Sequence, residues 1–414
     1  MKILLLLLAL GVAAGLQAEA KLALLGAFPE EKVVEVLSAE MAVDAHNAMP
    51  DAPKLRLAVF NGGASPTASV EAARKIAADP DVLAVVLHGE VAASPEVLQV
   101  LRQAGLAVVS ASSWAQPRTP SAGATWLCPS QTDLAESAAI FARREAKHSQ
   151  VAVVDDGSVT STAAAKAFAA RFRALGGKVP YEGTWSGGDD TLAALIHGLA
   201  AQWPQMVFYA GGAATAGRLV VAMKEEKSLK NSVLVGLPTL FEPAFFDTAR
   251  LKSMRSMALF PCPDYTGAGP LTRLIGFAFP KTSPEYKNYV RFAYRRPERW
   301  TSMIYDATAL ATRAFRAAAA PAPVAVASAG ALSPSAAAVD QSPAAQAAVA
   351  VPTREAVRLA LLGIDGYRGI RGSVKLGPDR EPAEPKAMVY FALNRVGKKE
   401  MTWRETASPY GPPF

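Results

Sequence analysis

The sequence predicts an α/β fold built from two parallel sheets, each covered by helices on both faces. From residue 21 onward, short apolar runs rich in β-formers alternate with helical segments, which is the pattern of a doubly wound sheet. These runs are apolar throughout, as expected for strands that are buried on both faces. The chain of 414 residues is also long for a single hydrophobic core, so it favours two lobes.

The first series of elements predicts one lobe of four strand–helix units. Ser65-Pro66 and Ser94-Pro95 each supply a helix N-cap and an N1 proline, and Gly105 ends the second of these helices. The strand candidates are residues 22–25, 55–60, 82–87 and 106–109.

A second series of strands and helices predicts the other lobe. Asp155-Asp156 is expected to cap the turn after its first strand, and Asp189-Asp190 to cap a helix that begins at Thr191. The strand candidates are residues 151–154, 178–181, 206–209, 232–235 and 257–260, and the helix candidates are residues 162–175, 191–202 and 213–224. Further helices are predicted at 285–294, 301–317 and 354–363, with β-like runs at 373–376 and 388–393.

The first twenty residues have the layout of a secretory signal peptide. Lys2 gives a positively charged start, an apolar core begins at Ile3, and Ala18-Glu19-Ala20 forms an A-x-A cleavage signature. The apolar run is shorter than the ~20 residues that a membrane-spanning helix needs. No Cys stands at the cleavage point, so no lipid anchor is indicated. We expect residues 1–20 to be removed, which leaves a soluble periplasmic protein beginning at Lys21.

Charge and motif content exclude several classes of function. The net charge of +7 is spread along the chain, whereas a nucleic-acid-binding surface concentrates its charge in a stripe. None of the four histidines stands in an H-E-x-x-H pattern, and no G-x-S-x-G motif occurs. Gly176-Gly177-Lys178-Val179 lacks the upstream Gly and the following Ser or Thr of a phosphate-binding loop. We therefore expect no enzyme, no cofactor, no metal site and no nucleic-acid partner.

One segment differs from the rest of the chain in composition. Residues 318–352 are almost purely Ala, Pro, Ser and Val, and Asp340 is their only charge. Such a segment cannot bury enough varied apolar surface to order itself. We expect a flexible surface insertion between two helices, and a role as a tethering or partner-binding arm stays open.

The order of these elements resembles the type I periplasmic binding proteins of the branched-chain amino acid (Leu/Ile/Val) ABC transport family. The resemblance covers most of the chain after the leader, and its motifs are informative together rather than singly. It is carried by residues 65–70 (S-P-T-A-S-V, where the family has D-P-x-x-A-V), 84–88 (A-V-V-L-H), 104–112 (A-G-L-A-V-V-S-A-S), 151–155 (V-A-V-V-D) and 305–307 (Y-D-A).

The resemblance implies two Rossmann-like lobes that are joined by three crossovers and hold a ligand in the cleft between them. It places the crossovers near residues 127–129, 260–263 and 372–375. Lobe one is then 21–127 with 263–372, and lobe two is 128–262 with 373–414. A partner permease in the inner membrane and a monomeric state are further implications.

The two cysteines of the chain, Cys128 and Cys262, both fall on these implied crossovers. They could form a disulfide that staples two hinge strands, which an oxidising compartment permits. The alternative is two separate buried thiols.

The sequence departs from the family where the family binds its ligand. Family members hold the carboxylate and ammonium groups of an amino acid with a recurrent polar set, because a buried zwitterion needs both charges paired. Carried over position by position, that set falls on Val91, Trp114, Thr160, Gly212 and Pro238. Nearly the whole zwitterion clamp is therefore missing.

The loops nonetheless carry polar and aromatic side chains that suit a different small molecule. Trp114 is a candidate stacking wall or, alternatively, a lobe-packing residue, and His88 is a candidate contact or a hydrogen-bonded turn residue. The complete set of candidate ligand-binding residues is His88, Glu90, Ser112, Ser113, Trp114, Asp156, Thr160, Gly212 and Thr239.

The first loop of the predicted site is short. Gly26-Ala27-Phe28-Pro29 leads straight into a helix expected from Glu30, which removes a wall of the usual pocket and favours either a shallow site or a protein partner. The sequence thus indicates the substrate-binding component of an ABC-type uptake system for an amino acid-like, aromatic or organic-acid solute. The alternative is a periplasmic accessory or sensor protein that uses the same fold to bind another protein.

Overall fold

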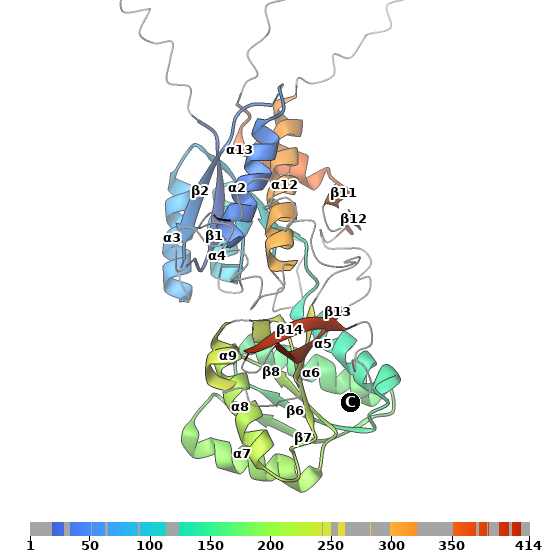
Figure 1. Cartoon of the computed structure of the whole chain (residues 1–414). Coiled ribbons are helices and arrows are strands. Elements are labelled where there is room, and N and C mark those ends of the chain that lie inside the picture. Colours follow the sequence, from blue (N-terminus) through green and yellow to red (C-terminus); the bar gives the residue numbers. More distant parts are fainter. Residues whose placement is uncertain are drawn as a thin grey trace, which may run out of the picture.

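The computed structural model of the chain describes residues 19–28, 34–50, 52–62, 65–89, 92–112, 124–241, 243–249, 256–260, 282, 299–320, 351–369, 372–378, 380, 389–396 and 400–406. These residues form two parallel-strand sheets with flanking helices, arranged as two bodies (Figure 1). The predicted α/β fold class is therefore confirmed.

The first sheet contains five parallel strands in the order β2-β1-β3-β4-β5. The strands are β1 (Lys21–Gly26), β2 (Arg56–Asn61), β3 (Val82–Leu87), β4 (Ala107–Ser110) and β5 (Ala124–Trp126). The helices packed on it are α2 (Val34–Asn47), α3 (Pro66–Ala78), α4 (Pro95–Gln103), α12 (Arg299–Ala319) and α13 (Arg354–Leu362).

Strand β1 shows why residues 22–25 are all apolar. Leu22 and Leu24 belong to the hydrophobic core that also contains residues of α2, α12 and α13. Ala23 and Leu25 belong to the core that contains residues of α3 and α4. Because successive side chains of a strand point to opposite faces, a sheet covered on both sides needs apolar residues at every position.

The two predicted helix starts in this lobe are confirmed. The Ser65 hydroxyl oxygen accepts a hydrogen bond from the Ala68 backbone N–H at 3.1 Å, and the Ser94 hydroxyl oxygen accepts one from the Val97 N–H at 3.4 Å. Proline follows each cap as the first helical residue, where its missing N–H costs no intrahelical hydrogen bond.

The second sheet contains seven strands in the order β14-β13-β10-β9-β8-β6-β7. Five are parallel: β6 (Gln150–Asp155), β7 (Lys178–Thr184), β8 (Met206–Ala210), β9 (Val233–Gly236) and β10 (Ser256–Phe260). Two antiparallel strands, β13 (Val389–Val396) and β14 (Glu400–Thr406), extend it. The flanking helices are α5 (Gln131–Ile140), which continues as the π-helix η2 (Phe141–Glu145), α6 (Val159–Ala174), α7 (Asp189–Gln202), α8 (Ala213–Glu225), the 3-10 helix η3 (Pro238–Phe241) and α9 (Pro243–Ala249).

A small hairpin follows α13 in the chain. Its strands β11 (Gly366–Gly369) and β12 (Gly372–Lys375) pair with each other, and the Leu376 N–H donates to the Asp365 carbonyl oxygen at 2.7 Å. Arg380 then donates to the Leu361 carbonyl oxygen at 2.7 Å, while its own carbonyl oxygen accepts from the Trp126 N–H at 2.8 Å. We therefore propose that lobe one extends to Arg380, rather than ending at residue 372; the other lobe boundaries stay predictions.

Four sequence expectations fall at or beyond the limits of the described residues. Helix α12 continues through Ala319, so the expectation that the insertion begins at residue 318 was wrong. The runs of alanine there favour the helix. Residues 321–350, the leader up to residue 18 and the helix expected at 285–294 lie outside the described residues, and so do residues 29–33 before α2. Among the described helices, none is both long enough and apolar enough to cross a membrane.

Candidate functional site

Polar loops follow the carboxyl ends of the parallel strands in both sheets, the position where open α/β sheets bind ligands. We call His88, Gly89, Ser110 and Ser112, which follow or end β3 and β4, the first cluster. The second cluster consists of residues at the carboxyl ends of β6, β8 and β9, in the loops after them or in the first turn of the next helix. Its members are Asp155, Asp156, Thr160, Gly211, Gly212 and Thr239.

The first cluster is held together by its own hydrogen bonds. The Gly89 N–H donates to the Ser112 hydroxyl oxygen, and the Ser112 N–H donates to the Ser110 hydroxyl oxygen at 3.2 Å. Gly89 has a φ of 89°, a left-handed conformation that glycine adopts without strain. Ser112 is 1% exposed, so its hydroxyl group shapes the turn after β3.

His88 is packed against the segment that follows β1. Its backbone N–H donates to the Leu25 carbonyl oxygen at 2.9 Å, and its ring stacks on Phe28 with centroids 6.1 Å apart. Asn61 fixes this segment, because its side chain accepts from the Phe28 N–H and donates to the Phe28 carbonyl oxygen. A Cβ at Gly26 would lie 2.6 Å from the Phe28 ring, so the close approach requires glycine. Phe28, in the short segment after β1, thus lies directly beside His88.

The second cluster is organised by Asp155, which is buried at the end of β6. Its Oδ1 accepts hydrogen bonds from the Gly157 N–H at 2.8 Å and from the hydroxyl groups of Thr162 at 3.1 Å and Thr184 at 3.2 Å. These contacts join β6 to β7 and α6. The expectation that this acid caps the following turn is confirmed, and the geometry assigns Asp155 to the framework.

Asp156 and Thr160 remain nearer the surface. The Asp156 N–H donates to the Ala210 carbonyl oxygen at 3.1 Å, and its Oδ1 accepts from the Ser158 N–H at 3.0 Å. Ser158 in turn caps α6, and Thr160 stands in the first turn of that helix. Both Asp156 and Thr160 are half-buried, so each keeps capacity for a further hydrogen bond.

Gly212 begins helix α8 without any side-chain cap. The Tyr209 hydroxyl group donates to the Thr215 hydroxyl oxygen at 2.6 Å, and Thr215 donates to the Gly212 carbonyl oxygen at 2.8 Å. Burial raises the pKa of Tyr209 to about 12, so it stays a donor. A Cβ at Gly211 would meet the Tyr209 hydroxyl oxygen at 2.4 Å, which explains the glycine there. The uncapped first turn offers N–H groups and a positive dipole end to an anionic group.

Thr239 lies beside this turn, because its hydroxyl group donates to the Gly211 carbonyl oxygen at 2.9 Å. Strands β6, β8 and β9 are neighbours in the sheet. The structure therefore brings Asp156, Gly212 and Thr239 to one sheet edge, as it brings His88 and Ser112 to the edge of the other sheet. The candidates Glu90, Ser113 and Trp114 lie outside the described residues, as does Val91.

Arg218 is a residue near the second cluster that the sequence analysis missed. Its guanidinium carbon lies 5.2 Å from the ring centroid of Trp185, and it donates to the Gly187 carbonyl oxygen and to Asp189. The N-cap of α7 is Gly188, so the expectation that Asp189 and Asp190 cap a helix from Thr191 was wrong. They stand in the first turn, where carboxylates favour the helix dipole.

Cys128 is buried just after β5, the last strand of the five-stranded sheet. Its Sγ lies 3.1 Å from the Ala111 carbonyl oxygen and 3.8 Å from Met303 Sδ. Cys262, the other half of the possible disulfide, lies outside the described residues. The disulfide stays a prediction.

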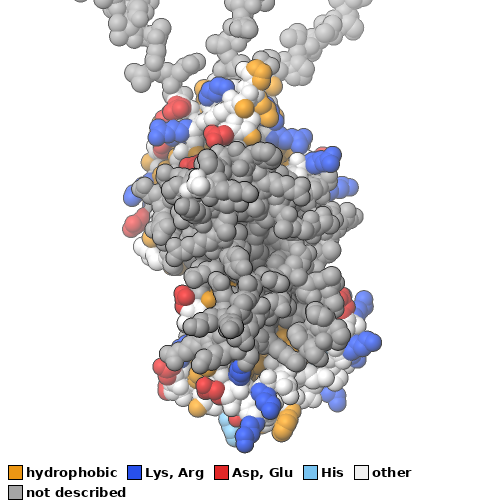
Figure 2. All heavy atoms as spheres, in the orientation of Figure 1, with side chains coloured by type: hydrophobic (Ala, Val, Ile, Leu, Met, Phe, Trp, Pro, Cys, Tyr) orange, Lys and Arg blue, Asp and Glu red, His pale blue; other side chains and the backbone are white. Residues whose placement is uncertain are grey.

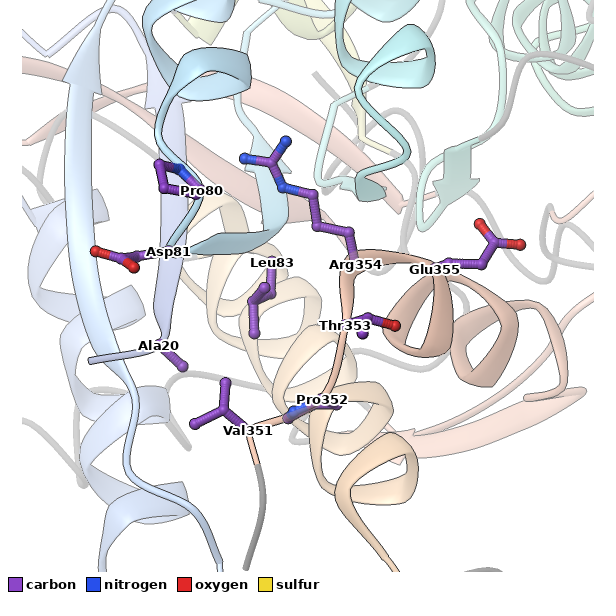
Figure 3. Close-up of a pocket in the computed structure, with 9 residues that line it drawn as sticks. All are labelled: Ala20, Pro80, Asp81, Leu83, Val351, Pro352, Thr353, Arg354 and Glu355. Carbon is purple, nitrogen blue, oxygen red and sulfur yellow. The ribbon is translucent and has the colours of Figure 1, made fainter. Parts of the chain in front are cut away.

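A cavity of about 400 Å³ lies away from both clusters, at the amino-terminal edge of the five-stranded sheet. Figure 3 shows its lining residues, which come from the start of β1, the turn before β3 and the start of α13: Ala20, Pro80, Asp81, Leu83, Val351, Pro352, Thr353, Arg354 and Glu355. Arg354 donates to the carbonyl oxygens of Val82 at 2.8 Å and Ala77 at 3.1 Å, and also to those of Asp79 and Ala104. Because this guanidinium group is already engaged by the backbone, we assign Arg354 to the framework. Within the described residues, no group of acidic, histidine and cysteine side chains could hold a metal ion.

Comparisons with known proteins agree with this architecture. No family model matches the chain, and no curated protein matches it in sequence. Solved structures do match: leucine-binding protein LivK of Thermotoga maritima has a TM-score of 0.66 at 14% identity and covers 93% of this chain and 97% of its own. LivJ of Streptococcus pneumoniae, in complex with isoleucine, has a TM-score of 0.65 at 13% identity, with 94% and 99% covered.

A periplasmic binding protein type 1 from Bordetella pertussis has a TM-score of 0.69 at 12% identity, with 94% of this chain and 100% of that one covered. These matches span nearly the whole length of every chain involved, while the identities are low. The protein therefore has the fold of the type I periplasmic binding proteins, with a sequence only 12–14% identical to those of these three structures.

Proposed function

We propose that this protein is the periplasmic solute-binding component of an ABC-type uptake system. It would bind a small solute between its lobes and present it to a permease in the inner membrane. The secretory leader read from the sequence supports the compartment. Structural neighbours described as leucine-binding, or solved with leucine or isoleucine, support a small-molecule ligand.

One observation carries the proposal. Both sheets end in polar loops at their carboxyl edges, and the second cluster combines a half-buried Asp156 and Thr160 with the uncapped start of α8 at Gly212. In a doubly wound sheet this edge is where helix N-termini and loop side chains face a ligand. Helix α7 also starts without a side-chain cap, but Asp189 and Asp190 stand in its first turn, whereas the first turn of α8 contains no acidic residue.

The ligand we infer carries an anionic or hydrogen-bond-accepting group for the start of α8. Amino acid-like solutes and aromatic or organic acids meet that requirement. The family's zwitterion clamp is absent at Val91, Trp114 and Pro238, so a free amino acid would have to be held differently. Trp114 remains a candidate stacking surface for an aromatic ligand.

Binding would act through closure of the two lobes. A ligand that contacts both carboxyl edges stabilises the closed arrangement by its differential affinity for it. Hinge motion then takes place in the segments that connect the sheets. The closed form would be the one that the permease recognises.

Thermal-shift screening of the purified protein tests this proposal. The panel is amino acids, aromatic acids and aliphatic organic acids. A true ligand at a hundredfold over its Kd stabilises the folded state by about 2.7 kcal/mol, which raises Tm measurably. Calorimetric titration of each hit should give one site per chain. No shift with any class would favour the alternative, an accessory or sensor protein with a protein partner.

A further inference from the structure

The amino-terminal edge of the seven-stranded sheet carries an exposed tryptophan in an unfavourable conformation. Trp203 ends helix α7, is 71% exposed and has φ 47° and ψ 50°. This left-handed conformation at a helix end is usually filled by glycine, because a side chain makes it costly. A bulky apolar residue that is both strained and exposed points to a role outside the fold's own packing.

Strand pairing fixes the surroundings of Trp203. The first residues of β7, β6, β8 and β9 pair with one another in that order: Lys178 with Gln150, Val151 with Met206, and Met206 with Val233. Because neighbouring strands are about 4.8 Å apart, the loops that precede these four strands lie side by side in a row. The Gln205 side-chain oxygen accepts from the Ser149 N–H at 3.0 Å. On the other side, the Ser232 hydroxyl group donates to the Pro204 carbonyl oxygen at 2.6 Å. Trp203 is thus held in the middle of the row.

The same row is basic. Residues 147–149, 176–178, 203–205 and 227–232 contain four lysines and no Asp or Glu. All four are exposed: Lys147, Lys178, Lys227 and Lys230. The nearest acid along the chain, Glu226, accepts from both the N–H and the hydroxyl group of Ser228. Figure 2 shows Lys and Arg side chains next to hydrophobic ones at the lower end of the molecule, around the helix labelled α7 in Figure 1.

We propose that this edge is a membrane-contact surface, on which Trp203 enters the headgroup region of an anionic phospholipid bilayer while the four lysines face lipid phosphates. Interfacial Trp and clustered Lys are the residues that bilayer surfaces attract. Because the edge is opposite to the second cluster, contact there leaves the carboxyl ends of the strands accessible. The surface is independent of the proposed solute binding.

Two other occupants fit the observations less well. A second copy of the chain in a two-fold contact would bring the four lysines against themselves, which like-charge repulsion opposes. A protein partner needs about 800 Å² on each side and several anchor residues. In the described loops of this edge, Trp203 is the one large hydrophobic residue that is more than a third exposed. A bilayer needs only one aromatic anchor together with cations.

Co-sedimentation with lipid vesicles tests the proposal on the purified full protein. We expect binding to vesicles of phosphatidylethanolamine and phosphatidylglycerol (3:1), no binding to phosphatidylcholine vesicles, and loss of binding in 0.5 M NaCl because salt screens the lysines. Trp203→Gly should lower partitioning about tenfold, and each of Lys147→Gln and Lys230→Gln about fivefold, the equivalent of ~1 kcal/mol per lysine. Lys75→Gln and Lys166→Gln, exposed lysines elsewhere, should change nothing.

Tm separates this role from a structural one. Trp203→Gly should leave Tm unchanged or raise it, because glycine relieves the left-handed conformation. A lower Tm with unchanged vesicle binding would overturn the proposal. Absence of binding to the anionic vesicles, or equal binding of all variants, would overturn it as well.

Discussion

The carboxyl ends of the two sheets are built alike but use their polar groups differently. In the first cluster, Ser112 is 1% exposed and already accepts from Gly89. In the second cluster, Asp156 and Thr160 are half-buried and α8 starts without a side-chain cap at Gly212. Buried polar groups are nearly always satisfied within the protein. We infer that the first cluster shapes its loops and that the second retains hydrogen-bonding capacity for a ligand.

The largest expected effect lies in the second cluster. Gly212→Asp should lower the affinity for any anionic hit of the ligand screen by about a hundredfold, or ~2.7 kcal/mol, because its carboxylate occupies the start of α8. Aspartate is a favoured N-cap residue, and the nearest atom to a Cβ there is Thr215 Oγ1 at 3.6 Å. Tm should therefore stay the same or rise. Calorimetric titration and thermal unfolding measure the two quantities.

Gly212→Asn is the matched control, since it caps the helix without adding charge. The affinity of the Gly212→Asn variant for the anionic ligand should fall less than the affinity of the Gly212→Asp variant. Equal affinities for both variants and the original protein would contradict a ligand at the start of α8. The inference that the second cluster, unlike the first, binds the ligand would then lose its support.

A change in the first cluster should cost stability instead. Ser112→Ala removes the acceptor of the part-buried Gly89 N–H and leaves an apolar side chain in the buried Ser112 position; a donor left unsatisfied away from water costs about 1–3 kcal/mol. The free energy of unfolding from denaturant titration should fall by about 2 kcal/mol. The affinity of the folded protein for its ligand should change little. Loss of affinity at unchanged stability would show that Ser112 contacts the ligand.

The smallest effect at neutral pH concerns Tyr209 beneath Gly211. Tyr209→Phe loses the hydrogen bond to Thr215, which should cost about 1 kcal/mol. At alkaline pH the two proteins should converge. The pKa of Tyr209 is about 12 in the folded state, against about 10 in the unfolded chain, so the unfolded state releases its proton first. The stability that Tyr209 contributes is fully present below pH 10 and is lost as pH rises toward 12.

Denaturant titrations of both proteins between pH 8 and pH 11 measure this difference. A constant gap between them over that range would show that Tyr209 ionises equally in both states. The hydrogen bond from the Tyr209 hydroxyl group to Thr215 would then contribute nothing to the stability of the folded state.

Local sequence signals predicted much of the architecture. The caps at Ser65 and Ser94, and the turn at Asp155, depend on residues within a few positions of each other, so their patterns could be interpreted directly. Apolar runs located nine of the ten parallel strands in the described residues. The inner strands are buried on both faces, whereas the edge strands β2 and β7 are exposed or part-buried. Strands β5, β11 and β14 and helices α5 and α9 were missed; β14, with the sequence EMTWRET, has no apolar run.

Long-range contacts escaped prediction for a physical reason. Arg380 donates to Thr125, which is 255 residues away, and Arg354 donates to Val82, which is 272 residues away. Nothing adjacent to either arginine distinguishes it from a solvated surface charge. Our proposal that lobe one extends to Arg380 depends on these contacts, which only the fold brings together. Likewise, Arg218 becomes part of the second cluster's surroundings only once β7 and α8 are placed.

The Arg354 contacts have a consequence for how this chain can vary. Four backbone carbonyl oxygens hold the residue that starts α13, and α12 ends at Ala319. Both ends of the segment 321–350 are therefore set by the fold, whatever the segment's length. For a segment that does not order itself, as the composition of residues 321–350 predicts, each doubling in length costs only about 0.6 kcal/mol in closure entropy. We therefore expect a permissive site here, where extra sequence can be accepted in evolution, or a reporter domain inserted in the laboratory, without altering the register of either sheet.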